Sequence, residues 1–414
     1  MSSEVPKGWQ LKTFGEIAKV KNGCAFKSAD FTDLESDSVL VIRMSDLKNG
    51  SISKQSAKRV PENIVSGLER FKLQRGDFVF GMSGSLRNYA VVPDSSVPMY
   101  LNQRVGKLEA TVSDTEFLRY LYTSEKFISN VEKSASGNAQ LNISGKLIES
   151  FEVLLPPLTE QKRIAEVLNS VDESIQATQR LIEQAERVKQ GLMEELLTGG
   201  LGSEAIERGE VPEGWEIGPI GKLACVKNGF AFKSKDFLQD DLDCESVAKV
   251  VRMSDFNGAE INLDRCKSIA EKGTEKLIRF QLNAGDIVIA MSGATVGKLG
   301  IMPKAPEKTY LNQRVGCFEP KSGDVGFLWN VLRSPNFRNE IIKLATGNAQ
   351  PNISAKQIES VLIPIPTLAE QTRIADVLSS VDDRVKGHKD ELGGLSRLKK
   401  GLMDDLLTGK VRTV

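Results

Sequence analysis

The chain of 414 residues, 40% of them hydrophobic, is long enough for two or three globular domains. Its 55 basic residues balance 55 acidic ones, which excludes a bulk polycation, so any nucleic acid would have to bind a local surface or a complex with another subunit. No stretch approaches the roughly 18 apolar residues that cross a bilayer, and the first residues lack a signal-peptide pattern, so we expect a cytoplasmic chain without a membrane partner. The five cysteines include no Cys-x-x-Cys pair, and we expect their thiols to be reduced.

Taken in order, the chain contains one sequence unit that occurs twice. Residues 5–9, Val-Pro-Lys-Gly-Trp, return as Val-Pro-Glu-Gly-Trp at 211–215, and five further segments return in the same order. A tandem duplication of a globular region followed by a long helix explains this order. The further pairs of matching segments are 21–31 and 227–237, 41–46 and 250–255, 76–84 and 285–293, 100–106 and 310–316, and 137–144 and 347–354.

Each globular region combines short apolar runs, which predict strands, with amphipathic runs, which predict helices. The fold class is therefore α+β, with many loops. A segment rich in glycine and charge predicts a linker before the second region. The expected elements are strands at 77–80, 151–155, 286–289 and 361–365, helices at 115–134 and 324–344, and the linker at 199–214.

A long helix is predicted after each globular region. At 159–197 apolar residues alternate at steps of three and four, the a/d seam of a coiled coil. At 1.5 Å per residue this helix would be about 58 Å long. Each apolar stripe is too narrow for burial in a globular core but suited to packing against the other helix. The seam residues are Ile164, Leu168, Val171, Ile175, Thr178, Ile182, Ala185, Lys189, Leu192 and Leu196 in the first helix, and Ile374, Leu378, Val381, Val385, His388, Leu392, Leu395, Lys399, Leu402 and Leu406 in the second.

The expected ends of both helices carry matching signals. Prolines before each helix block an earlier start, and Thr159 is a candidate N-cap. Gly199 and Gly409 follow the same Leu-Leu-Thr sequence, where a left-handed C-cap is expected. Gly393 and Gly394 should loosen the second helix locally. The alternative is two unrelated amphipathic helices in separate cores.

Motifs for catalysis are incomplete. Residues 293–298, Gly-Ala-Thr-Val-Gly-Lys, are one residue short of a phosphate loop, and Leu299 stands where Ser or Thr would bind magnesium. Residues 334–337, Ser-Pro-Asn-Phe, lack the second proline of the amino-methyltransferase motif Asn-Pro-Pro-Tyr. We find no glycine-rich nucleotide turn, nucleophile elbow or metal-ligand cluster, and the single histidine, His388, lies on the seam. We expect no catalytic residue, metal site or cofactor in this chain.

Amide, hydroxyl and basic side chains recur in the loops of both halves and are our candidates for DNA contacts. Asn and Gln can form two hydrogen bonds to adenine, and Arg can form two hydrogen bonds to guanine or phosphate. Lys-Ser pairs beside glycine suit phosphate contacts. For any single residue, a role in capping helices and tying loops stays open. The candidates are Lys27, Ser28, Arg43, Ser83, Arg87, Asn88, Asn102, Gln103, Arg104, Asn138, Gln140 and Asn142 in the first half, and Lys233, Ser234, Arg252, Ser292, Thr295, Lys298, Asn312, Gln313, Arg314, Asn348, Gln350 and Asn352 in the second.

Segments whose sequences differ between the two halves should recognise the features that differ between the two targets. We expect base discrimination there, with Arg87 and Asn88 set against Thr295 and Lys298 as the favoured residues. Residues that are identical in both halves should build the fold or hold phosphate. The divergent segments are 32–40 and 238–249, 48–72 and 257–281, and 86–99 and 295–309.

Residues 155–171 (LPPLTEQKRIAEVLNSV) are repeated at 365–381 (IPTLAEQTRIADVLSSV), and this pattern resembles the specificity (S, or HsdS) subunit of type I restriction-modification systems. The Pro-x-Gly-Trp segments, the Gly-Asp-apolar-Ser-Gly segments and the Gly-Asn-Ala-Gln-x-Asn-Ile-Ser loops are also similar, so the resemblance covers essentially the whole chain. It implies two tandem target-recognition domains, each reading one half of a bipartite site in double-stranded DNA. The two long helices would pack as an antiparallel coiled coil with pseudo-two-fold symmetry.

The resemblance also implies domain boundaries. Residues 1–155 would be the first target-recognition domain, 156–200 the central spacer helix, 201–363 the second target-recognition domain and 364–414 the C-terminal spacer helix. A rigid rod between two readers would make the gap between half-sites part of the specificity.

The partners implied by the resemblance carry the chemistry. Two modification subunits would dock on the helices and methylate adenine with S-adenosylmethionine, and restriction subunits would use ATP and magnesium to translocate and cleave DNA. This chain would then be a non-catalytic subunit without a cofactor of its own. The alternative is a protein-only adaptor, or an anti-restriction or assembly component, that uses the long helices to oligomerise.

Overall fold

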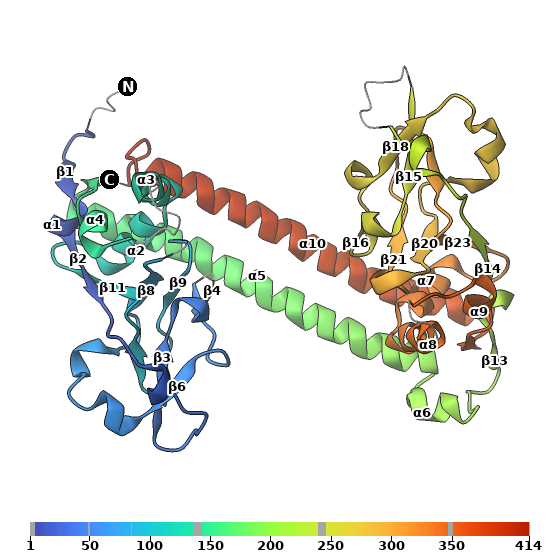
Figure 1. The fold of residues 1–414 in the computed structure, drawn as a ribbon, viewed down its shortest axis with the longest axis horizontal. Helices are drawn as coiled ribbons and strands as arrows, with labels where there is room; N and C mark the ends of the chain where they lie inside the picture. Colours follow the sequence, from blue (N-terminus) through green and yellow to red (C-terminus); the bar gives the residue numbers. More distant parts are fainter. Residues whose placement is uncertain are drawn as a thin grey trace. The chain divides into compact units, whose positions relative to one another are not determined.

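The computed structural model describes residues 5–48, 50–83, 85–135, 143–238, 246–346 and 351–413. Contacts divide the chain into unit 1, Met1–Gln179 with Asp390–Val414, and unit 2, Arg180–Lys389. Each unit therefore joins one globular domain to part of two long helices. These helices are α5 (Leu158–Thr198, green in Figure 1) and α10 (Leu368–Leu406, red).

Unit 1 contains two four-stranded sheets, in the orders β2-β11-β8-β9 and β6-β3-β10-β7. Strand β8 lies between two cores because its side chains alternate: Phe78 and Phe80 pack with the helices, whereas Val79 packs toward the second sheet. This explains why every residue of β8 is buried. The elements are β1 (Gln10–Thr13), α1 (Phe14–Ile17), β2 (Ala18–Asn22), β3 (Ser38–Ile42), β4 (Leu47–Lys48), β5 (Ser51–Ile52), β6 (Lys58–Pro61), β7 (Lys72–Leu73), β8 (Phe78–Gly81), β9 (Tyr89–Val91), β10 (Met99–Leu101), β11 (Val105–Ala110), α2 (Thr115–Thr123), α3 (Glu125–Ala135), α4 (Gly145–Glu149) and β12 (Glu152–Leu155).

Unit 2 repeats this plan with one difference in its sheets. The four-stranded sheet has the order β18-β15-β22-β19, while the other sheet has six strands, β14-β23-β20-β21-β17-β16. In unit 1 the counterparts of β16 and β17 form a separate pair, β4 with β5. The elements are α6 (Gly202–Glu207), β13 (Glu216–Pro219), β14 (Ala224–Asn228), β15 (Val247–Val251), β16 (Phe256–Asn257), β17 (Glu260–Ile261), β18 (Lys267–Ala270), β19 (Gln281–Leu282), β20 (Ile287–Ala290), β21 (Leu299–Ile301), β22 (Thr309–Leu311), β23 (Val315–Pro320), α7 (Val325–Arg333), α8 (Pro335–Ala345), α9 (Ala355–Glu359) and β24 (Leu362–Ile365).

A short antiparallel ladder closes each globular domain next to its helix. Strand β1 pairs with β12, which places Gln10 opposite Leu155, and β13 pairs with β24 in the same way. The first strand of each domain therefore lies beside the strand that leads into α5 or α10. Both ends of the domain are held at the start of a long helix.

Within each unit, α5 and α10 run in opposite directions. In unit 1, Asp172 of α5 contacts Lys399 of α10, and Glu160 near the start of α5 contacts Arg412 beyond the end of α10. Residue numbers therefore rise along one helix as they fall along the other. The corresponding contacts in unit 2 are Lys189 with Asp382 and Glu186 with Lys389. The expected packing of the two helices is confirmed.

The expectation that the apolar stripe is too narrow for a globular core is wrong at the helix ends. Ile164 and Leu168 of α5 are fully buried in the core of unit 1, together with Leu406 of α10. Ile374 and Leu378 of α10 belong in the same way to the core of unit 2. The end turns can be buried because the domain packs over the side of the helix that the second helix leaves uncovered.

The four expected strands are confirmed, but each expected helix of the globular regions is two helices. Residues 115–134 divide into α2 and α3 at Ser124, and 324–344 divide into α7 and α8 at Ser334. Both serines have extended backbone, and their hydroxyl oxygens accept hydrogen bonds from Phe127 N–H and Phe337 N–H. The expected linker at 199–214 contains the short helix α6.

The ends of the long helices follow the sequence signals in part. Gly199 (φ +62°) directly follows α5 and is left-handed, as expected for a C-cap. Gly409 (φ +71°) is also left-handed, but α10 already ends at Leu406 and residues 407–409 form a turn. Helix α5 begins at Leu158, so Thr159 lies in the first turn and is not the N-cap. Helix α10 continues through Gly393 and Gly394, because glycine keeps the backbone N–H and C=O of a helical residue and costs only about 1 kcal/mol relative to alanine.

Candidate nucleic-acid interface

Backbone hydrogen bonds join the candidate loops of unit 1. The Cys24 N–H donates to the Leu101 carbonyl at 3.1 Å, which ties the loop after β2 to the turn between β10 and β11. The Met82 N–H donates to the Arg104 carbonyl at 3.0 Å, and the Ile143 N–H donates to the Met82 carbonyl at 2.9 Å. These bonds bring together the segments that carry Lys27, Ser28, Ser83, Asn102, Gln103 and Arg104.

Unit 2 builds the same loop cluster with equivalent bonds. The Phe230 N–H donates to the Leu311 carbonyl at 2.8 Å, and the Met291 N–H donates to the Arg314 carbonyl at 3.0 Å. The Ile353 N–H donates to the Met291 carbonyl at 3.0 Å. The segments joined here carry Lys233, Ser234, Ser292, Asn312, Gln313, Arg314 and Asn352.

A glycine permits the closest of these approaches in each unit. A Cβ atom on Gly23 would lie 2.2 Å from the carbonyl oxygen of Asn102, and one on Gly229 would lie equally close to that of Asn312. Any other residue would push the loops apart. Asn102 and Asn312 are half-buried. The exposed side chains of the two clusters are Lys27, Ser28, Gln103 and Arg104 in unit 1, and Lys233, Ser234, Gln313, Arg314 and Asn352 in unit 2.

Arg43 and Arg252 are committed to carboxylates inside their own domains. Arg43 Nη2 lies 3.0 Å from Asp46 Oδ1 and Nε lies 3.1 Å from Oδ2, and Asp46 is fully buried. Arg252 contacts the fully buried Asp255 in the same way, at 2.9 and 3.3 Å. Since the carboxylate occupies two guanidinium nitrogens, we leave both arginines out of the proposed DNA surface.

Ser83 and Ser292 also point inward. Both are buried, and their hydroxyls lie 3.5 and 3.2 Å from the sulfur atoms of Met44 and Met253. Arg314 Nη1 donates to the Ser292 hydroxyl at 3.3 Å. These serines support the loops and are not exposed to a ligand, so they are left out of the proposed surface as well.

The residues favoured for base discrimination differ in exposure. Arg87 forms a two-pronged ion pair with Glu125, 2.7 Å on each side, and both side chains are about half exposed. Asn88 and Thr295 are half-buried, whereas Lys298 is exposed.

Five further candidates for DNA contacts lie outside the described residues. They are Asn138, Gln140, Asn142, Asn348 and Gln350.

The predicted seam residues vary in burial along the two helices. The buried ones are Ile164, Leu168, Val171, Thr178, Ile182, Ile374, Leu378, Val385 and Leu406, and the half-buried ones are Ile175, Ala185, Lys189, Leu192, Leu196, Val381, His388, Leu392, Leu395, Lys399 and Leu402. Burial does not simply follow position along the helices. Ile182 and Val385, near the middle, are buried, whereas Leu196 and Leu402, near the ends, are half-buried although they pack against the domain cores.

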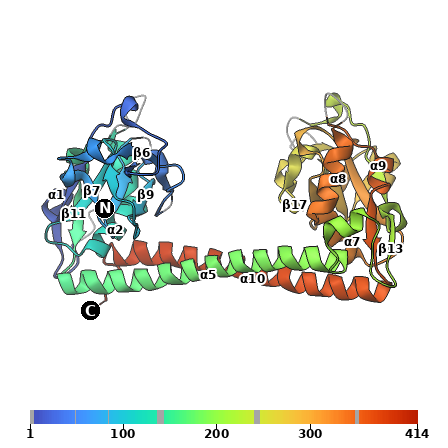
Figure 2. The same cartoon turned by 90° about the horizontal axis from the view of Figure 1, so that it is seen from below.

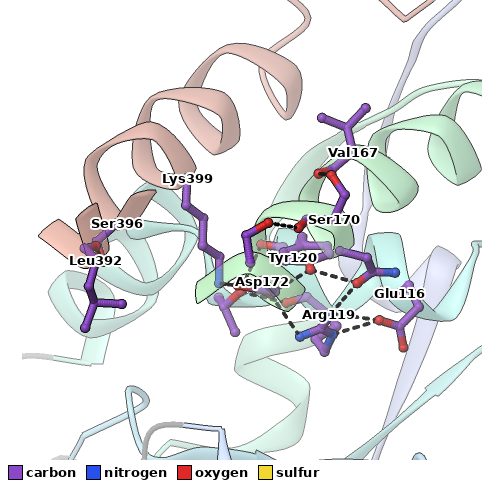
Figure 3. A network of polar contacts seen from close by, with 12 residues as sticks. Glu116, Arg119, Tyr120, Val167, Ser170, Asp172, Leu392, Ser396 and Lys399 are labelled. Carbon is purple, nitrogen blue, oxygen red and sulfur yellow. Dashed lines mark hydrogen bonds and ion pairs between the residues drawn. The ribbon is translucent and has the colours of Figure 1, made fainter. Parts of the chain in front are cut away.

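A polar network that the sequence analysis missed joins the first domain to both helices (Figure 3). Asp172 of α5 lies 2.5 Å from Lys399 Nζ of α10, 3.7 Å from Arg119 Nη1 of α2 and 2.7 Å from the Tyr120 hydroxyl. Burial raises the pKa of Tyr120, and its hydrogen bond to Asp172 raises it further, so the hydroxyl stays protonated. Helix α2 thus lies against α5, as Figure 2 also shows.

Unit 2 has a matching network at the equivalent carboxylate. Asp382 of α10 contacts Lys189 of α5, and it accepts a hydrogen bond from Arg333 Nη2 of α7 at 2.7 Å. Burial raises the pKa of Asp382, but the hydrogen bonds from Arg333 and Lys189 lower it below its ordinary value. The sequence signal was a lysine at the same seam position of each helix, 189 and 399, where an apolar residue is usual.

The C-terminal segment holds the start of the first domain. Arg412 Nε and Nη2 lie 2.7 and 2.8 Å from the two carboxylate oxygens of Glu160, and Trp9 Nε1 donates to Glu160 at 2.9 Å. Arg412 Nη1 also donates to the Lys7 carbonyl at 3.0 Å. Unit 1 therefore encloses residues from both ends of the sequence.

The described part of the chain offers no cluster of three metal-binding side chains, and none of its helices is long and apolar enough to cross a membrane.

Burial raises the thiol pKa values of Cys266 and Cys317 to about 12. A thiol with such a pKa is protonated at neutral pH and is a poor nucleophile.

Comparisons of the sequence point to one family. The family described as "Type I restriction modification DNA specificity domain" matches residues 6–187 and 212–394. The specificity subunit of the type I restriction enzyme MjaVIII from Methanocaldococcus jannaschii is 28% identical over 417 residues, covering 99% of this chain and 94% of that protein. The EcoBI specificity subunit from Escherichia coli is 22% identical, covering 97% of this chain and 86% of that protein.

Solved structures share the fold. A chain from a structure described as "Structural basis underlying complex assembly and conformational transition of the type I R-M system" aligns with a TM-score of 0.59 at 19% identity, over 99% of this chain and 100% of that one. The type I restriction-modification S subunit from M. genitalium aligns with a TM-score of 0.58 at 16% identity, over 98% and 97%. Because the family match covers both halves of the duplication, the chain belongs to the family of type I restriction-modification DNA specificity subunits.

Proposed function

We propose that this specificity subunit reads a bipartite site in double-stranded DNA, with one domain on each half-site. The observation that carries the proposal is the doubled loop cluster. Each unit presents an exposed Lys-Ser pair and an exposed Gln-Arg pair on loops tied by equivalent backbone bonds. Glutamine can form two hydrogen bonds to N6 and N7 of adenine, and arginine can donate two hydrogen bonds to O6 and N7 of guanine or bind phosphate. In this proposal Lys298 and the divergent loops discriminate between bases.

The helices would set the gap between the half-sites. Residues 1–155 and 201–363 act as target-recognition domains, and residues 156–200 and 364–414 act as spacers. The proposal is supported by networks in each unit that join a domain to both helices, at Asp172 and at Asp382. Readers fixed to a stiff helix pair can engage only half-sites at a matching distance and angular phase.

The catalytic steps would belong to partner subunits. Specificity subunits are the non-catalytic part of type I enzymes. We propose that two modification subunits dock on the helices and supply S-adenosylmethionine for adenine methylation. Restriction subunits, where present, would supply ATP hydrolysis with magnesium. This chain would supply the DNA sequence preference of the complex.

Methylation mapping tests this function. Genomic DNA would be sequenced with base-modification detection from cells that express the chain with its modification subunit, and from cells that lack only this chain. A split adenine-methylated motif with a fixed gap, lost without the chain, is expected. A folded complex with no chain-dependent motif would reject DNA reading and favour a protein adaptor.

Domain assignment needs paired variants. Replacing Gln103 and Arg104 by Ala should relax or abolish one half of the motif, and replacing Gln313 and Arg314 should affect the other half. Arg75→Ala, which removes an exposed arginine paired with Asp94, is the control and should leave the motif intact. If either pair changed both halves equally, the assignment of one domain to each half-site would be wrong.

A further inference from the structure

Each domain holds two exposed cations over aromatic rings, at matching positions within the otherwise divergent segments 48–72 and 257–281. In unit 1, Lys58 Nζ lies 5.2 Å from the centre of the Phe31 ring, and Arg70 Cζ lies 4.5 Å from that of Phe71. In unit 2 the equivalent cations are Lys267, 5.6 Å from Phe237, and Arg279, 4.6 Å from Phe280. We call these four contacts the cation-ring pairs.

The rings are held in place by a buried core while the cations reach solvent. Phe31 and Phe71 are half-buried against the core that contains Tyr100, and Phe237 and Phe280 pack in the same way around Tyr310. All four cations are exposed. A ring fixed in this way favours one direction for the charged group, which lowers the entropy cost of binding an anion there.

The sheet order separates the two cations of each domain. Lys58 begins β6 and Arg70 immediately precedes the segment leading into β7, and these strands form the two edges of the sheet β6-β3-β10-β7. With neighbouring strands about 4.8 Å apart, the edges are about 14 Å apart. This distance is too large for one phosphate group. Each domain therefore offers two separate positive contacts, and Lys267 and Arg279 flank the sheet of unit 2 in the same way.

The pairs border the loop clusters proposed to contact DNA. In unit 1, the Tyr100 hydroxyl on β10, the strand that leads into the turn with Asn102, donates to the Glu69 carboxylate at 3.5 Å, and Glu69 directly precedes Arg70. In unit 2, the Phe280 ring beneath Arg279 lies 5.5 Å from that of Phe230, whose N–H bonds to Leu311. The positive charges thus extend the same surface.

These charges are not neutralised by a carboxylate within the described ranges. No ion pair there involves Lys58, Arg70, Lys267 or Arg279, whereas Arg43, Arg87 and Arg252 all have acidic partners. The cations also recur at matching places in segments whose sequences otherwise differ, 48–72 and 257–281. A contact required of both domains, whatever bases each reads, is a contact with the DNA backbone.

We propose that the cation-ring pairs are phosphate-binding sites that hold each domain on the DNA backbone independently of sequence. This proposal rests on DNA binding by the subunit, as proposed above. Phosphate contacts should contribute to affinity on every sequence and to its salt dependence, and not to the choice between sequences.

The test compares two quadruple variants of the full chain in fluorescence-anisotropy titrations. One variant changes Lys58, Arg70, Lys267 and Arg279 to Ala. The control removes the same number and types of charge at exposed cations that already have carboxylate partners, namely Lys12, Arg75, Lys222 and Arg208. Each protein is titrated onto a duplex with the mapped motif and onto a shuffled duplex, at several salt concentrations between about 50 and 200 mM.

We expect the slope of log K against log salt to fall by about 3 to 4 in the first variant, at about 0.9 per lost phosphate contact, on both duplexes. The affinity ratio between the duplexes should stay within about twofold of wild type, and the control should keep the wild-type slope. If the variant without the cation-ring pairs had the same slope as the control variant, the proposal would be overturned. A loss of affinity that occurred only on the motif duplex would also overturn it. If wild type itself ignored the motif, the proposed function would fail, while the slopes on shuffled DNA would still test the phosphate sites.

Discussion

The surroundings of Arg43 and Arg87 decide what the loss of each guanidinium would cost. Removing Arg43 leaves the buried Asp46 carboxylate without its charged partner, whereas Glu125 is free to turn into water when Arg87 is removed. We predict that Arg43→Ala lowers the free energy of unfolding by about 3 kcal/mol or more, and that Arg87→Ala lowers it by less than about 1 kcal/mol. Urea denaturation followed by tryptophan fluorescence and circular dichroism measures both. Equal losses of unfolding free energy in the two variants would mean that Asp46 finds another partner when Arg43 is removed.

Acid should weaken the contact between the C-terminal segment and the first domain. Hydrogen bonds from Arg412 and Trp9 lower the pKa of Glu160 from its ordinary value of 4.5. The folded state thus holds this carboxylate charged more strongly than the unfolded state, and the resulting stability is present above pH 4.5 and lost as the pH falls through the folded pKa.

We predict that wild type is more stable than Glu160→Gln at neutral pH and that the difference shrinks steadily below pH 4.5. The measurement is the free energy of unfolding of both proteins across the acid range. Arg208→Ala serves as a control, because its ion pair with Glu210 is exposed. A difference that does not depend on pH would argue for a packing effect instead of a charge effect.

At the residue scale, the sequence predicts which loops come together but not which side chains remain available. The recurrence of Asn-Gln-Arg after a strand marks the right turn in both domains, and Gln103 and Arg104 are indeed exposed. The partner of Arg87, by contrast, lies on α3, far along the sequence. Such pairs depend on tertiary approach, for which spacing along a loop gives no signal.

At the element scale, Asp172 connects α2, α5 and α10. We predict that Asp172→Asn lowers the free energy of unfolding by about 3 kcal/mol, because Lys399 and Arg119 lose their shared counter-charge. Lys399→Met should cost less than about 1 kcal/mol, since Asp172 keeps Arg119 and Tyr120, and Met suits a seam position. Denaturation gives the energies, and amide hydrogen exchange should show α2 opening in the first variant only. Similar costs for both would show that Lys399 is the essential partner.

The elements themselves were largely predictable, for reasons that differ between them. A seam repeated over many turns predicts α5 and α10 to within a few residues, and the Gly-Asp-apolar pattern predicts β8 and β20. The break between α7 and α8 had a signal, Pro335, which follows a serine cap. The break between α2 and α3 had only Ser124, and a serine alone does not distinguish a cap from a helical residue.

At the scale of the whole molecule, the length of the helix pair should control the gap in the DNA site. We predict that deleting four residues within 174–190 shifts or abolishes recognition without changing either half-sequence. One helical turn is about 5.4 Å, which equals one or two base pairs at roughly 3.4 Å each. Methylation mapping of the deleted chain reports both the gap and the half-sequences. An unchanged gap would contradict the spacer role.

A companion deletion separates length from seam phase. Removing 182–188 together with 383–389, which face each other within unit 2 in the register set by Lys189 with Asp382, takes one heptad from each helix and keeps the seam aligned. The gap should then shorten by about three base pairs, because seven residues span about 10 Å. A motif that is abolished by the single deletion but shortened by the paired one would show that phase and length act separately.

The core of unit 1 has a consequence for synthesis on the ribosome. It includes Trp9 and Phe14 from the beginning of the chain and Leu406 and Leu407 from its end. The first domain therefore cannot complete its core until residues 406 and 407 have left the exit tunnel, although the core of unit 2 is complete earlier. A nascent or truncated chain would expose apolar surface that chaperones and proteases recognise. A chain released before residue 406 would therefore lack part of the core that its first domain needs to fold.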